Sequence, residues 1–245
     1  MPTGRVITVI QARTGSTRLP AKVLRPLGDS TVLGWVVRAA QEASGVDQVV
    51  VATSEAPDDE RVAEAAKNLG VPVVRGSEDD VLSRFLQAVD EHPCDAVVRL
   101  TADCPLADPV LIGQTVAVWR ADPSLDYVAT TLVRNLPRGL DVEIATVDAL
   151  RRVSKTATGY HRTHVTSGLY ADPGTFRLAG LTFVPRAEDL RVTLDTPQDA
   201  ALIEAVVAEL GAGPLPWRDV VALLRARPDL VALNAEVVQK RLEEG

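Results

Sequence analysis

The segment VIQARTGSTRLPAKVL, from Val9 to Leu24, places cationic and amide side chains directly after an apolar stretch. Gly15 and Ser16 permit a tight loop whose backbone N–H groups can face an anion. A helix end contributes only about 0.3–1 kcal/mol to anion binding, whereas a charge-assisted hydrogen bond contributes roughly 1.5–3 kcal/mol. The segment therefore predicts an anion-binding loop that depends mainly on its polar side chains, namely Gln11, Arg13, Arg18 and Lys22.

Two common nucleotide-binding motifs are missing from this loop. It contains neither Gly-x-x-x-x-Gly-Lys-[Ser/Thr], the phosphate-binding loop of many NTPases, nor Gly-x-Gly-x-x-Gly, the dinucleotide fingerprint. On spacing alone, a solvated surface loop with unrelated charges remains an alternative. The choice between the two interpretations depends on the rest of the chain.

The composition limits the class of protein. The chain has 245 residues and a net charge of −7, which argues against a nucleic-acid-binding protein because such proteins usually carry a basic face. No apolar run approaches the roughly 20 residues of a membrane span, and the N-terminus lacks a signal-peptide pattern. We therefore expect a cytoplasmic protein without a nucleic-acid or membrane partner. Cys94 and Cys104 form no Cys-x-x-Cys pair, so a structural zinc site is not expected.

Strand and helix patterns alternate along the first half of the chain. Apolar, β-branched runs predict strands over 5–10, 46–53, 71–76 and 94–103. Helical spacing predicts helices over 31–43, 58–70, 78–92 and 109–122. This alternation favours a doubly wound, parallel α/β sheet. Ligands bind such sheets outside the carboxyl ends of the strands, so we expect four polar segments to converge there, namely 11–22, 53–55, 75–80 and 101–105.

The second half of the chain is less regular. Its patterns predict strands over 126–130, 140–146, 176–183 and 190–195. They predict helices over 147–155, 197–210 and 217–244. No long linker or repeat interrupts the chain, so we expect one domain over residues 1–245, with residues 127–185 as a smaller, β-containing excursion.

Six segments of the chain carry a more specific signal. They are IQARTGSTRLPAKVL (10–24), GSEDDVLSRF (76–85), RLTADCPLADP (99–109), PRGLDVEI (137–144), RTHVT (162–166) and RVTLDTPQDA (191–200). In this order they resemble the SpsF-like cytidylyltransferases, of the superfamily of CMP-sialate and CMP-KDO synthetases. The resemblance implies a Rossmann-like, mostly parallel sheet of the nucleotide-diphospho-sugar transferase (GT-A-like) type, the use of CTP and Mg²⁺, and a homodimer.

The resemblance also implies roles for individual residues. It assigns the CTP phosphates to Arg13, Ser16, Arg18 and Lys22, with Gly15 shaping the loop. Catalysis falls to Arg18, Lys22 and Asp103. The remaining nucleotide-binding residues implied are Gln11, Ala12, Thr53, Ser54, Arg75, Ser77, Asp79, Arg84, Thr101 and Ala102. For the acidic residues near Ser77, helix capping remains an alternative.

Asp103 and Asp195 resemble the metal-binding aspartates of the superfamily. Mg²⁺ usually takes one or two carboxylates, and phosphate oxygens and water complete its shell. Asp195 has a second interpretation, because it precedes Thr196 and Pro197 and could cap a helix that has proline at its first position. Both roles are compatible with one residue.

The resemblance places Arg138, Asp141, Glu143 and His164 on the acceptor side. The planar guanidinium of Arg138 suits a carboxylate or phosphate, which it binds with two parallel hydrogen bonds; a strand with exposed charges is the alternative. The family pattern Arg-Glu-His-Val-Thr reads Arg-Thr-His-Val-Thr here, with Thr163 in place of the glutamate. His164 is therefore expected to contact either the acceptor or a dimer partner, and the excursion over 127–185 to serve both.

We expect the chain to transfer CMP from CTP to an anionic acceptor and to release pyrophosphate. An acid sugar, a phosphosugar and a phosphonate are all possible acceptors, in line with polysaccharide biosynthesis. Two alternatives remain: a glycosyltransferase that uses a nucleotide sugar, and a non-catalytic nucleotide-sugar-binding protein. Cys104 is expected to pack rather than react, and a metal site at His161 and His164 is not expected because no third ligand is evident.

Overall fold

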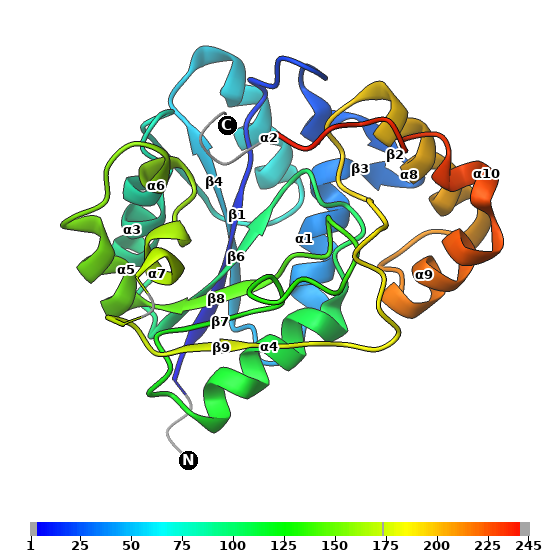
Figure 1. Cartoon of the computed structure of the whole chain (residues 1–245). Coiled ribbons are helices and arrows are strands. Elements are labelled where there is room, and N and C mark those ends of the chain that lie inside the picture. Colours follow the sequence, from blue (N-terminus) through cyan, green and yellow to red (C-terminus); the bar gives the residue numbers. More distant parts are fainter. Residues whose placement is uncertain (1–3, 173, 241–245) are drawn as a thin grey trace.

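A seven-stranded sheet forms the centre of the computed structural model, which describes residues 4–172 and 174–240 (Figure 1). The strand order is β5-β4-β1-β6-β8-β7-β9. The strands span Val6–Gln11 (β1), Gln48–Ser54 (β4), Val73–Gly76 (β5), Ala96–Thr101 (β6), Tyr127–Ala129 (β7), Glu143–Thr146 (β8) and Leu178–Gly180 (β9). A short hairpin of Pro26–Leu27 (β2) and Ser30–Thr31 (β3) lies outside this sheet.

The sheet is mostly parallel, as the sequence predicts. β1 pairs in parallel with β4 and β6, and β4 pairs in parallel with β5. β8 runs antiparallel to both of its neighbours, β6 and β7, while β7 and β9 are parallel. Gln11 stands opposite both Ala52 and Thr101 in the register, so β1 and β6 end level and their following loops leave the sheet side by side.

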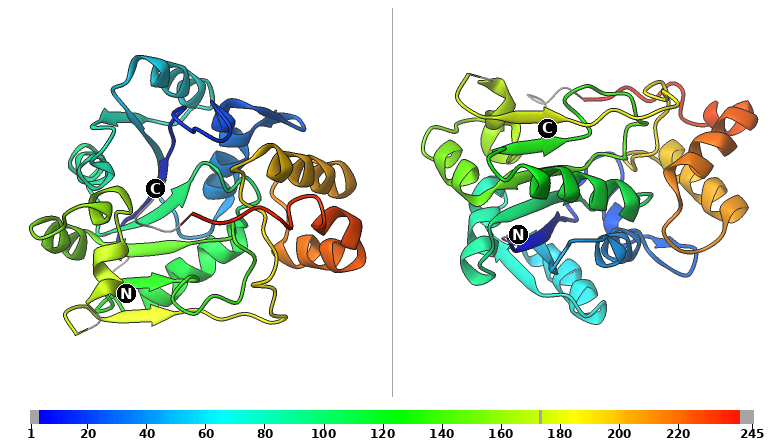
Figure 2. Two further views of the ribbon diagram at one scale, coloured as in Figure 1. Left: turned by 45° about the horizontal axis from the view of Figure 1, so that its top comes forward. Right: turned by 90° about the horizontal axis from the view of Figure 1, so that it is seen from below.

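Helices cover both faces of the sheet (Figures 1 and 2). Along β1 the side chains alternate, so Ile7 and Val9 belong to one core and Val6 and Ile10 to the other. The first core is shared with Val81–Glu91 (α3), Val147–Ser154 (α5) and Ser167–Ala171 (α7). The second is shared with Val32–Glu42 (α1), Glu60–Asn68 (α2), Pro109–Ala121 (α4), Pro197–Leu210 (α8) and Trp217–Ala226 (α9). The expected doubly wound α/β fold is confirmed.

The predicted excursion over residues 127–185 extends the central sheet. It contributes β7, β8 and β9, all of which join the same seven-stranded sheet, together with α5, Tyr160–Thr163 (α6) and α7. The assignment of residues 1–245 to one domain, and the part of the excursion in a dimer contact, stay predictions. Within the described residues, no helix is both long and apolar enough to cross a membrane.

Three predicted elements are wrong in extent or type. The strand expected over 176–183 is only the short β9. The strand expected over 190–195 is an extended segment outside the sheet, because Val192 N–H donates to Arg138 and Leu194 N–H donates to Asp103 rather than to a neighbouring strand. The helix expected over 217–244 stops at Ala226, because Arg227 precedes a proline and leaves the helical region. Up to Lys240 only Pro228–Val231 (α10) resumes it, and positions 241–244 of the prediction lie outside the described residues.

Candidate active site

A pocket of about 630 Å³ opens where β1 and β6 end. It brings together most of the predicted site residues, from segments far apart in the chain. Its lining consists of Gln11, Ala12, Arg13, Gly15, Ser16, Thr17, Arg18, Lys22, Val23, Val81, Arg84, Arg99, Thr101, Ala102, Asp103, Cys104, Arg138, Gly139, Asp141, Thr163, His164, Thr193, Asp195, Gln239 and Lys240. The expected convergence therefore holds for the segments 11–22 and 101–105.

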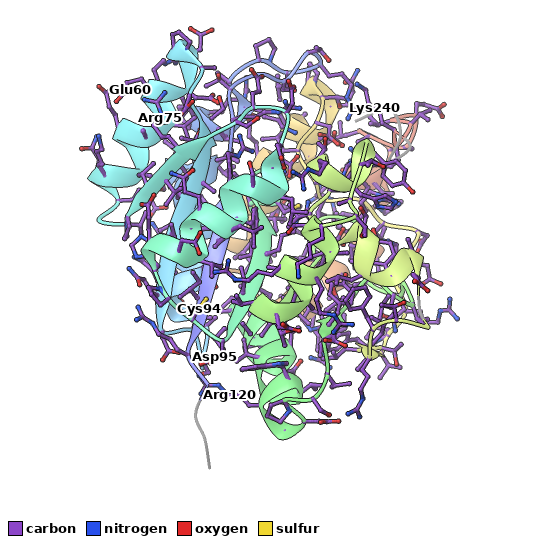
Figure 3. All side chains as sticks on the ribbon, turned by 90° about the vertical axis from the view of Figure 1, so that its left-hand side faces the viewer. Glu60, Arg75, Cys94, Asp95, Arg120 and Lys240 are labelled. Atoms are coloured by element: carbon purple, nitrogen blue, oxygen red, sulfur yellow. The ribbon has the colours of Figure 1, made fainter. Side chains whose placement is uncertain are left out.

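The segments 53–55 and 75–80 end at the same edge of the sheet but do not line the pocket. Arg75 donates to the Ser54 and Ala56 carbonyl oxygens and pairs with Glu60. Figure 3 shows Arg75 and Glu60 together, on the opposite side of the molecule from Lys240. For the predicted residues outside the lining, direct nucleotide binding stays a prediction; they are Thr53, Ser54, Arg75, Ser77 and Asp79.

The cationic loop is held by an aspartate that sequence reasoning missed. Both the backbone N–H and the hydroxyl of Thr14 donate to Asp59, at 2.6 and 2.7 Å. Ser54 donates to the other carboxylate oxygen of Asp59. Burial raises the pKa of Asp59, but these hydrogen bonds outweigh it and hold the pKa below its ordinary value. Ser54 thus stabilises the loop indirectly, through Asp59.

Lys22 lies between the two predicted metal-binding carboxylates. Its Nζ is 2.7 Å from Asp103 Oδ2 and 2.7 Å from Asp195 Oδ1. Burial lowers the pKa of Lys22, but the two carboxylates outweigh it and hold the pKa above its ordinary value. Residues 81 and 173 positions apart in the sequence therefore meet at one ammonium group.

Asp195 belongs to a denser network than Asp103. Its Oδ2 accepts from Arg191 Nη2 at 2.7 Å and lies 3.1 Å from Arg18 Nη2. The cap of α8 is not Asp195 but Thr196, whose hydroxyl accepts from the Asp199 N–H while Asp199 Oδ2 accepts from the Thr196 N–H. The capping alternative for Asp195 is therefore wrong, and its carboxylate faces the pocket cations.

The residues present suit a magnesium ion better than a transition metal. Two carboxylates, Asp103 and Asp195, converge on one point, and Mg²⁺ needs only one or two with phosphate and water. Among residues 4–172 and 174–240, no cluster of three or more His, Cys, Asp or Glu side chains could hold a metal ion. His161 instead bonds Ser167 through Nδ1 at 2.8 Å.

Arg84 is a buried guanidinium without a full set of partners. It is 2% exposed and lines the pocket, yet its Nε and Nη1 have no hydrogen-bond partner among residues 4–172 and 174–240. Burial and the nearby charge of Arg13 lower its pKa. The predicted capping of α3 belongs to Asp80, which accepts from the Ser83 N–H at 2.9 Å. Because unpaired buried donors cost free energy, Arg84 is suited to a ligand that brings acceptor atoms.

Arg138 is a second pocket cation without an ion pair or side-chain hydrogen bond among the described residues. The nearest carboxylate on its segment, Asp141, is engaged by Arg134 through two hydrogen bonds of 2.7 and 2.9 Å. Burial, followed by the charge of Arg134, lowers the pKa of Arg138. Thr163, in place of the family's glutamate, and His164 also line the pocket.

Arg99 is a pocket residue that was not predicted, although an arginine inside the apolar run AVVRLT is a visible signal. Its Nε and Nη2 donate to Gln11 Oε1 at 3.2 and 3.0 Å. A guanidinium has no acceptor, so the amide oxygen of Gln11 must face Arg99. The Gln11 NH₂ group is therefore turned away from Arg99, and Gln11 lines the pocket.

Glu143 lies behind Arg99 and outside the pocket lining. It pairs with Arg99 and accepts from the Tyr127 and Thr166 hydroxyls. Burial raises the pKa of Glu143, but Arg99 and these hydroxyls outweigh it and keep the pKa below its ordinary value. Glu143 therefore acts on the pocket through Arg99, and its predicted direct contact with an acceptor stays a prediction.

Neither cysteine is placed to react. Cys104 is buried beside Asp103, and burial raises the pKa of its thiol. Burial, with the charge of Asp95, raises the pKa of Cys94 to about 11. Figure 3 places Cys94 at the opposite end of the molecule from Lys240. Both thiols are therefore protonated near neutral pH, which agrees with the expected packing role of Cys104.

Comparison with known proteins gives consistent results. The family model described as cytidylyltransferase matches residues 7–211. Spore coat polysaccharide biosynthesis protein SpsF of Bacillus subtilis is 32% identical, over 91% of this chain and 95% of its own. A solved cytidylyltransferase from Leptospira borgpetersenii is 28% identical with a TM-score of 0.89, over 97% of this chain and 99% of that one.

A structure of CMP:2-keto-3-deoxy-manno-octonic acid synthetase complexed with CTP has a TM-score of 0.67 at 18% identity, over 84% of this chain and 99% of that one, which shows a common fold. The sheet is thus of the nucleotide-sugar transferase type that the sequence predicts. Because the family model spans most of the sequence and SpsF is similar over nearly all of it, the chain belongs to the cytidylyltransferase family and is an SpsF-like nucleotidyltransferase enzyme.

Proposed function

We propose that the chain transfers CMP from CTP to a small anionic acceptor and releases pyrophosphate. The observation that carries this proposal is that several of the cations lining the pocket lack strong partners. Within the described part of the chain Arg84 and Arg138 have no ion pair, and Arg13 lies 3.7 Å from its carboxylate, Glu78. Two anionic substrates meeting in one pocket account for this excess of positive charge.

On the nucleotide side, the loop that contains Arg13, Arg18 and Lys22 binds the triphosphate. The acceptor oxygen attacks the α-phosphorus, the bond to the β-phosphate oxygen breaks, and pyrophosphate leaves. Arg18 and Lys22 stabilise the negative charge that develops on the phosphate oxygens. No protein nucleophile is needed, since the protein holds the two substrates together and neutralises charge. A relative's structure complexed with CTP supports CTP as the donor.

Asp103 and Asp195 are the residues that would hold Mg²⁺. When bound, the ion neutralises charge on the phosphate oxygens. Lys22 lies between these carboxylates, so its contacts must change as the phosphates bind. Arg191 and Arg18 keep Asp195 in place from its other oxygen.

On the acceptor side, Arg138 binds the anionic group of the acceptor. A neutral sugar would leave the guanidinium without an ionic partner in a partly closed pocket, which costs binding free energy. An acid sugar, a phosphosugar and a phosphonate each carry a group that matches the guanidinium fork. The homodimer and the cytoplasmic location stay predictions.

The test is to incubate the protein with labelled CTP, Mg²⁺ and a panel of acid sugars, phosphosugars, phosphonates and neutral sugars. We expect pyrophosphate release and a CMP-linked product with at least one anionic acceptor. Glycosyl transfer from a nucleotide sugar would contradict the proposal in favour of a glycosyltransferase. Nucleotide-sugar binding without turnover of any pair would favour a non-catalytic binding protein.

A further inference from the structure

Two residues that line the pocket lie far beyond the family match. The family model ends at residue 211, whereas Gln239 and Lys240 border the same pocket as the cationic loop. After α10 the chain runs back across the molecule toward the end of β1, as the red segment in Figures 1 and 2 shows. Residues 232–240 are called the C-terminal arm here. The pocket is thus completed by a segment outside the family model.

The arm is anchored by a buried asparagine. Asn234 is 5% exposed, and its Nδ2 donates to Asp199 Oδ1 at 2.8 Å and to the Arg191 carbonyl at 3.2 Å. Asp199 is the residue that completes the cap of α8 and accepts from Arg191 Nε at 2.9 Å. The anchor therefore joins the arm to the segment that carries Asp195.

The tip of the arm contacts the two arginines that hold Asp195. Arg191 Nη1 donates to Gln239 Oε1 at 2.5 Å, and Arg18 Nη1 donates to the Val238 carbonyl at 3.4 Å. Each guanidinium uses another nitrogen for Asp195 Oδ2. Loss of the arm would remove one hydrogen-bond partner from each guanidinium group and leave its contact with Asp195. The arm and the Asp195 carboxylate therefore hold the same two arginines in place.

We propose that the C-terminal arm is part of the active site: it positions Arg18 and Arg191 on Asp195 and adds Lys240 to the cations that bind the triphosphate. The role of Lys240 rests on the proposed use of CTP; the positioning role rests on the contacts of Asn234 and Gln239. Asn234 and Gln239 are positioning residues, because they act on substrate only through the arginines.

The first experiment compares Asn234→Ala with Glu236→Ala, an exposed arm residue whose side chain has no hydrogen bond or ion pair with the described residues. Trypsin cleavage after Lys240 is followed by mass spectrometry, with and without CTP. We expect Asn234→Ala to be cut about tenfold faster than wild type and the KM for CTP to rise about tenfold, as for the loss of a hydrogen bond to a charged group. Glu236→Ala should behave as wild type.

Gln239→Ala is a second variant that tests the arm in case Asn234→Ala fails to fold. Gln239 is exposed, and its removal leaves no cavity. We expect unchanged thermal unfolding, faster cleavage and a KM for CTP raised about threefold to tenfold. Lys240→Met should raise the KM for CTP without faster opening of the arm. Opening is followed here, in the variant and in the wild type, as chymotryptic cleavage after the exposed Leu233, because the variant lacks the bond after Lys240 that trypsin cuts in the other variants.

The outcomes separate this proposal from the proposed function. If the wild type binds CTP and releases pyrophosphate, but Asn234→Ala, Gln239→Ala and Lys240→Met match it in cleavage and KM, the arm proposal fails alone. If the wild type neither binds nor turns over CTP, the proposed function fails and takes the role of Lys240 with it. Faster cleavage of Asn234→Ala and Gln239→Ala would then still support the docked arm.

Discussion

The cations that line the pocket fall into two groups, those with ionic partners in the protein and those without. The three cations that contact Asp195 are paired: Lys22 bridges two carboxylates, and Arg18 and Arg191 share one. Arg84 and Arg138, which also line the pocket, lack such partners in the part of the chain that the structure describes. Paired cations fix the geometry of the protein's own carboxylates, whereas the unpaired ones are those that we propose to bind substrate anions. The comparison predicts opposite effects on stability and binding when each kind is removed.

The largest effect is expected from Lys22→Ala, because Lys22 is both a paired cation and a proposed catalytic residue. We expect kcat to fall by about 10²–10³, the cost of one lost transition-state donor. The measurement is pyrophosphate release at saturating CTP. Lys67→Ala, at an exposed position on α2, is the matched control. Wild-type turnover in Lys22→Ala would show that the bridging ammonium is structural only.

Substitution of the two aspartates distinguishes an effect on catalysis from an effect on stability. Asp103→Asn and Asp195→Asn should both lower activity and weaken its dependence on Mg²⁺. Only Asp195→Asn should also unfold earlier, because it leaves Arg18 and Arg191 without their shared carboxylate. A loss of about 2 kcal/mol is expected there, which corresponds to roughly 4–8 °C in Tm for a chain of this size. Equal Tm values in calorimetry, or unchanged metal titrations, would contradict the distinction.

The sharpest contrast is between Arg84 and Arg99, both pocket arginines on the same side of the sheet. Arg84→Met removes unpaired buried donors, so we expect equal or higher Tm together with a KM for CTP raised about tenfold or more. Arg99→Met leaves the buried carboxylate of Glu143 without its ionic partner and should lower the free energy of unfolding by about 3 kcal/mol. Denaturant unfolding and CTP titration of both variants measure this. A destabilised Arg84→Met would show that its guanidinium has partners in the protein.

Much of the first half of the fold follows from local patterns. The predicted strand over 46–53 and helix over 109–122 match β4 and α4 within two residues, because strand burial and proline caps leave periodic signals. The sequence also predicts that Arg13, Arg18 and Lys22 lie together, since they are close in the chain, and all three line the pocket. The network around Asp195 was not, because it joins Arg18, Arg191 and Asn234 across most of the chain. No local pattern encodes such a contact.

The acceptor side is tested by Arg138→Lys, which keeps the charge but loses the planar fork. We expect the KM for the acceptor to rise about fivefold to tenfold, as for one lost charge-assisted hydrogen bond, while the KM for CTP and the Tm stay the same. Steady-state kinetics with each substrate varied in turn give both KM values. A selective rise in the KM for CTP, or a wild-type preference for a neutral sugar, would assign Arg138 another role.

The smallest effect is expected from Gln11→Glu, which reverses polarity without removing a partner. A carboxylate at this position still accepts from Arg99, so the Tm should not fall, but the NH₂ group of Gln11 is replaced by an oxygen. A substrate oxygen or nitrogen that accepts from Gln11 would then meet another acceptor, and we expect the KM for that substrate to rise about fivefold. Kinetics with CTP and acceptor varied separately identify which substrate it is, and Gln48→Glu, on the same sheet but outside the pocket lining, is the control. If neither KM changes, the amide of Gln11 serves only to accept from Arg99, and its NH₂ group does not donate to either substrate.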